Sequence, residues 1–132
     1  MKKAQIFILM LILSLFTMAV YSQTAATWKE MEDFHGVMST SFHPAEEGNL
    51  QPLKDNAADL LTKSKAWQKS AVPQGYNAVM TKDVLKRLTK QCSIVKDAVK
   101  NKKADTELVK LITEAHEIFH EIKEKCRTTE TK

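Results

Sequence analysis

The sequence is poor in the residues that interrupt helices. Among 132 residues there are three glycines and three prolines, and most of them lie between apolar patterns. No stretch alternates apolar and polar residues as a half-buried strand does, and β-branched residues are not concentrated anywhere. The sequence therefore predicts an all-α protein without a sheet.

An excess of charge of one sign is also missing. After removal of Lys2 and Lys3 with the leader described next, 18 basic and 16 acidic residues remain, a net charge of +2. So small an excess does not favour binding to nucleic acid or to an acidic membrane surface. No Gly-rich phosphate loop and no C-x-x-C-H motif occurs, which excludes covalent c-type haem attachment.

The one long hydrophobic run lies at the start of the chain. Residues 6–20 are almost wholly apolar after a positive Met1-Lys2-Lys3, and Val20 and Ser22 place small residues at the −3 and −1 positions of a cleavage site. These are the three parts of a secretory signal peptide. We expect residues 1–22 to be cleaved and residues 23–132 to form one secreted or periplasmic domain with no membrane segment. An uncleaved anchor is the alternative.

Four apolar patterns with helical spacing fill the rest of the chain. They predict helices over about residues 27–42, 50–70, 78–100 and 105–126. We expect the first to end where Pro44 biases His43 away from helical geometry, and the tail from Arg127 to fray. Short connections such as the polar turn at 101–104 predict an antiparallel up-down-up-down four-helix bundle.

The two cysteines do not suit a disulfide in this bundle. With the turn at 101–104 as the fold point, Cys92 and Cys126 are separated by about 20 Å along the helix axes at about 1.5 Å per residue. A disulfide needs Cα atoms within about 7 Å. Cys92 is interpreted as a buried apolar residue. Cys126 is interpreted as a thiol near the surface and a candidate for dimer formation.

The histidines are the candidate functional residues. His116 and His120 lie four apart and therefore on one side of the last helix. His35 occupies the apolar stripe of the first helix, given by Trp28, Met31, His35, Met38 and Phe42. Antiparallel packing sets His35 and Met38 opposite His120 and His116, with His43 about a turn further on.

The stretch from His116 to His120 also fits H-E-x-x-H, the zinc-peptidase motif. A peptidase needs a third ligand downstream, and no histidine follows His120. We therefore expect no enzyme activity, and Glu117 is interpreted as a surface residue. Imidazole is the commonest transition-metal ligand. A bare copper, zinc or nickel ion held by His35, His116, His120 and His43 is one hypothesis.

Helices 27–42 and 105–126 resemble those of the periplasmic cytochrome b562 and cytochrome c-prime group. Phe119-His120 is similar to the aromatic-His step late in that family's last helix, and residues 101–104 to its polar turn. The resemblance implies non-covalent haem b, held by His35 and His120 or by Met38 and His120, and electron transfer. The family's methionine ligand position is His35 here, and His116 is an additional coordinating group.

These readings give three hypotheses for an exported bundle. The resemblance narrowly favours haem binding and electron transfer, with a redox partner. The residues alone equally support binding or sensing of a bare metal ion, with a sensor partner. The third hypothesis is a bundle that binds a protein and uses its histidines structurally.

Overall fold

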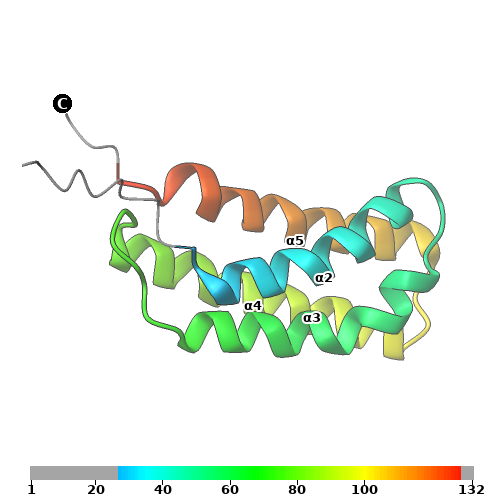
Figure 1. Cartoon of the computed structure of the whole chain (residues 1–132). Helices are drawn as coiled ribbons and strands as arrows, with labels where there is room; N and C mark the ends of the chain where they lie inside the picture. The colour runs from blue at the N-terminus through cyan, green and yellow to red at the C-terminus, as the bar shows by residue number, and fades with distance from the viewer. Residues whose placement is uncertain (1–26, 129–132) are drawn as a thin grey trace, which may run out of the picture.

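The structure, a computed structural model, describes residues 27–128 (Figure 1). Four α-helices account for most of them, and the described range contains no strand: α2 (Lys29–Glu46), α3 (Gln51–Lys69), α4 (Ala78–Lys100) and α5 (Asp105–Lys125). The predicted all-α class and the bounds of the last three helices are confirmed to within about one residue. The proposed signal peptide and its cleavage site lie outside the described residues.

The predicted end of the first helix is wrong. α2 continues through Pro44 to Glu46 and is closed by Gly48, which has a φ of +89°. The N–H of Gly48 donates to the carbonyl of Ala45, and that of Asn49 to the carbonyl of Pro44, as in a Schellman motif. Pro44 lacks a backbone N–H and therefore removes only one hydrogen bond from the helix. The cap supplies N–H donors to the carbonyls of Pro44 and Ala45. His43 therefore lies on α2 and not in a loop.

The four helices form a bundle in which neighbours in sequence are neighbours in space. α2 packs on α3, α3 on α4 and α4 on α5, and α5 returns to α2 across the least extensive of the four contacts. We call this last contact the α2–α5 seam. The core between the helices is apolar, and its largest fully buried side chains are Trp67, Phe34, Phe119, Met38, Leu53, Leu60, Leu85, Leu88, Leu108, Ile112, Ile122 and Val84.

The α3–α4 loop is bonded to the end of α5. The N–H of Asn77 donates to the carbonyl of Cys126 at 2.8 Å, and the N–H of Thr128 to the carbonyl of Gly75 at 2.9 Å. Tyr76 and Arg127 form an isolated β-bridge between these bonds. The expected fraying therefore does not begin at Arg127, because the loop supplies backbone partners.

Both cysteines are free and fully buried. Burial raises the pKa of the Cys92 thiol to about 12 and also raises that of Cys126. The expectation that Cys126 lies near the surface is wrong, since the bonded loop at Asn77 covers the end of α5. None of the helices within residues 27–128 is both long enough and apolar enough to span a membrane.

Candidate metal centre

The four histidines come from the first and last helices of the bundle. α2 carries His35 and His43, which are exposed, and α5 carries His116 and His120, which are half-buried. Each of the other three acts electrostatically on His116. The histidines therefore gather around His116 along the α2–α5 seam.

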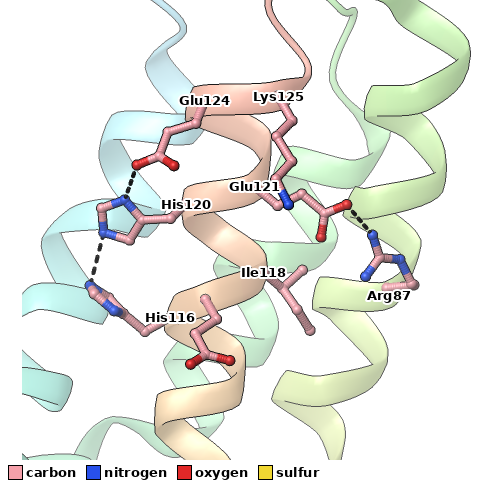
Figure 2. Close-up of a pocket in the computed structure, with 8 residues that line it drawn as sticks. Arg87, His116, Ile118, His120, Glu121, Glu124 and Lys125 are labelled. Atoms are coloured by element: carbon pink, nitrogen blue, oxygen red, sulfur yellow. Dashed lines mark hydrogen bonds and ion pairs between the residues drawn. The ribbon is translucent and has the colours of Figure 1, made fainter.

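His116 and His120 face each other through their ring nitrogens (Figure 2). Their Nε2 atoms are 3.2 Å apart, and their ring centroids are separated by 4.5 Å. Helical spacing places the two residues one above the other on α5, as the sequence predicts. The pair offers two imidazole nitrogens to one point in space.

Aromatic rings hold both sides of this pair. The ring of Phe42 stacks on His116 with centroids 3.8 Å apart and planes 14° apart. His35 stacks on Phe119 at 5.1 Å, and Phe119 also contacts His120 edge-on at 5.5 Å. Phe119 and Phe42 are both buried. The core thus presents two rigid faces against which the histidines are oriented.

Carboxylates contact two of the histidines at the other ring nitrogen. Nδ1 of His120 is 3.4 Å from Oε1 of Glu124, and Nδ1 of His43 is 3.4 Å from Oε2 of Glu46. A carboxylate at Nδ1 favours the tautomer with the proton on Nδ1 and leaves Nε2 as a lone pair. The sequence interpretation missed both carboxylates, although each lies one helical turn beyond its histidine and that spacing could have identified them.

The environment disfavours the charged form of His116. Burial lowers the pKa of His116 below its ordinary value, and the neighbouring His120 and His43 lower it further. Glu46 acts in the opposite direction. Because metal ions bind the neutral ring and compete with protons, this shift favours metal binding at neutral pH.

An open groove of about 490 Å³ extends over α5 from the histidine pair to α4. Figure 2 shows the two histidines on one side of α5 and the Arg87–Glu121 ion pair, at 2.7 Å, on the other. Glu117 of the H-E-x-x-H motif lines the groove and is exposed. With Glu121 and Glu124 it gives the lining three carboxylates against Arg87 and Lys125, a balance that favours an approaching cation.

The candidate haem ligands do not meet around one space. Met38 is fully buried in the core, whereas His35 is exposed. The groove that His120 lines includes neither His35 nor Met38. The ring of Phe119 contacts both His35 and His120. Haem binding by these residues therefore stays a prediction.

Within residues 27–128, no group of three or more His, Cys, Asp or Glu side chains is already arranged around one point. The preformed part of the candidate site is therefore the pair His116 and His120. His43 is the next imidazole, with its ring centroid 6.2 Å from that of His116.

No protein-family model matches the chain, and neither the curated proteins nor the solved structures include a significant match. The resemblance to the cytochrome b562 and c-prime group accordingly stays a prediction.

Proposed function

We propose that the protein binds a divalent transition-metal ion through the imidazoles of His116 and His120. The observation that carries this proposal is the 3.2 Å separation of their Nε2 atoms. With Zn–N bonds of about 2.0–2.1 Å, two ligands of a tetrahedral ion lie about 3.3 Å apart. The pair therefore has the spacing of two ligands of one ion, and small rotations of the rings would direct both lone pairs toward it.

In this proposal, the metal ion replaces the proton that lies between the two Nε2 atoms. One of the two Nε2 atoms carries the proton of this hydrogen bond and the other accepts it. On metal binding, that proton moves through solvent to Nδ1 of its own ring, so that both Nε2 atoms can ligate the ion. The ion then occupies the position between the two Nε2 atoms.

The chemistry of the ligands favours copper, zinc or nickel. Imidazole nitrogen is a borderline ligand that suits these ions, and affinity at a given nitrogen site is generally highest for Cu(II). The proposed role is binding and not peptide hydrolysis. Glu117 is exposed, and the described residues include no strand that could align a peptide.

The proposal includes an antiparallel up-down course for the helices. Two pairs of contacts between α4 and α5 support it, because residue numbers rise along one helix as they fall along the other. The side-chain amide of Gln91 donates to Glu114 at 3.0 Å, and Arg87 donates to Glu121 at 2.7 Å. The proposal also includes export, which rests on the leader-like residues 1–22.

Calorimetric titration of the purified protein with Cu(II) and with Zn(II) tests this function. We expect stoichiometric binding that His116→Ala/His120→Ala abolishes. In excess metal the wild-type protein should gain stability, about 2.7 kcal/mol at a free concentration of 100 times Kd. An absorption spectrum of the protein as isolated distinguishes the haem alternative, since bound haem gives a Soret band. Metal affinity that is unchanged in the double variant would contradict the proposal.

A further inference from the structure

We infer that the bound ion takes a third imidazole from His43, with Glu46 and Glu124 as positioning residues, so that the metal cross-links α2 to α5. This inference rests on the proposed function, because it completes the site that His116 and His120 begin. The resulting site has three Nε2 ligands. Metal binding there would also change how the helices of the bundle are held together.

The first step is the placement of His43. Because α2 continues to Glu46, His43 lies in its last turn, one residue after Phe42. Phe42 stacks directly on His116, and the His43 ring meets that of His116 edge-on at 6.2 Å. The buried ring of Phe42 therefore fixes the height of His43 relative to the pair on α5.

The second step is whether one ion can reach all three rings. An ion bonded to Nε2 at about 2.0–2.1 Å lies about 3.2 Å from the ring centroid, so two rings on one tetrahedral ion have centroids about 5.2 Å apart. The centroid separation of 4.5 Å for His116–His120 is close to this value, whereas the 6.2 Å for His43–His116 exceeds it by about 1 Å, so the ring of His43 must turn toward the pair. The side chain of His43 is exposed and has room to rotate toward the pair.

The third step is the choice of ring nitrogen. Glu46 contacts Nδ1 of His43 and Glu124 contacts Nδ1 of His120, each at 3.4 Å. The hydrogen bond between His43 and Glu46 matches the carboxylate–histidine–metal arrangement, in which the outer carboxylate fixes the tautomer and makes the ring more basic. Glu124 lies at ion-pair distance on the same side of the His120 ring, so Nε2 is the nitrogen that each ring has left to ligate the ion.

The fourth step is the consequence for the bundle. The α2–α5 seam is the least extensive contact between neighbouring helices. An ion held by His43 from α2 and by His116 and His120 from α5 would join the first and last helices at this least extensive contact. Metal binding therefore restrains the last turn of α2.

Electron spin-echo envelope modulation spectroscopy counts the imidazoles that are bound to Cu(II), and it therefore tests the ligand set directly. We expect three imidazoles in the wild-type protein and two in His43→Ala, which keeps His116 and His120. Two in both proteins would overturn the inference while the proposed function stands. Absence of any coordinated imidazole would remove the proposed function itself. Three imidazoles retained in His43→Ala but lost in His35→Ala would assign the third ligand to His35 and overturn the inference.

The positioning residues are tested by affinity at fixed pH. We expect Glu124→Ala to weaken Zn(II) binding about 10–100-fold. Glu124→Gln, which keeps an acceptor oxygen, should restore much of the affinity. Glu107→Ala is the matched control, because Glu107 is exposed on the same helix, does not line the groove and, among the described residues, bonds to neither histidine. Equal affinity in Glu124→Ala and Glu107→Ala would overturn the positioning role.

The cross-link is tested by amide hydrogen exchange in the last turn of α2, with and without Zn(II). Exchange there should slow on metal binding in the wild-type protein and stay unchanged in His43→Ala at saturating Zn(II). This readout separates a cross-link from binding by α5 alone. Slowing to the same extent in His43→Ala would overturn it, as would a zinc-induced dimer in which His43 is dispensable.

Discussion

The contact between α3 and α4 and the α2–α5 seam differ in what they contain. Between α3 and α4, Thr89 donates to the carbonyl of Ser64, and Cys92 is buried beside the hydroxyl of Ser64. The α2–α5 seam instead carries the four histidines, partly open to solvent. The first contact therefore buries Ser64 and Cys92, whereas the second leaves imidazoles partly open to solvent, where they can bind a ligand.

The largest expected effect is a change in the free energy of unfolding, and it is tested by comparing a variant of a core leucine with a variant of a histidine. Leu88→Ala removes a fully buried side chain from α4, and we expect it to lower the free energy of unfolding by about 2–5 kcal/mol. His120→Ala in metal-free protein should change it by about 1 kcal/mol or less, because its side chain is partly exposed. Urea denaturation of both variants measures this. A comparable loss of unfolding free energy in His120→Ala would mean that the histidines are structural. The contrast between the two helix contacts would then be wrong.

A second test uses alkaline pH, to which the buried thiol beside Ser64 should respond. The pKa of Cys92 is about 12 in the folded protein against 9.0 for an exposed thiol. Above pH 9 the unfolded chain loses this proton while the folded protein keeps it, so stability falls as pH rises from 9 towards 12. The slope attributable to Cys92 has a limit of about 1.4 kcal/mol per pH unit.

Denaturation of the wild-type protein and Cys92→Ala at several pH values between 9 and 11 measures this slope. The variant should have the flatter profile. Parallel profiles for the two proteins would show that the thiol ionises as readily in the folded protein as in the unfolded chain.

The smallest expected effect lies at the end of α4. Lys102 has a φ of +53°, and its N–H and that of Lys103 donate to the carbonyls of Val99 and Ala98. This conformation costs an L-residue roughly 1–2 kcal/mol, part of which glycine loses again through its greater chain entropy. Lys102→Gly should therefore stabilise the protein by up to about 1 kcal/mol with no change in metal affinity. A decrease in stability, measured by thermal unfolding, would contradict the assigned cap.

The helices could be predicted from the sequence because apolar residues at 3.6-residue spacing report directly on burial. The bounds of α3, α4 and α5 followed from this pattern and from the polar turns between them. The end of α2 could not be placed this way. Pro44 and Gly48 both signal a helix end, and only the backbone hydrogen bonds of the cap decide between them.

The candidate site was predictable in part. The spacing of His116 and His120 by itself brings their rings together. Side-chain exposure across the seam was not accessible from the sequence, because it depends on how the helices rotate about their axes. That rotation buries Met38 and exposes His35, although both occupy one apolar stripe. The burial of Cys126 could not be predicted from the sequence either, because the loop that covers it is distant in sequence.

The cap at Gly48 also sets how the chain tolerates changes in length. An α-helix turns about 100° per residue, from 3.6 residues per turn. One residue inserted within α2 between Phe42 and Gly48 would change the register of the Schellman cap, and one inserted between Phe34 and Phe42 would turn His43 away from His116. Insertions between Asn49 and Leu50 fall beyond the cap and should leave His43 in place. Asn49 thus marks the end of the segment whose length is fixed.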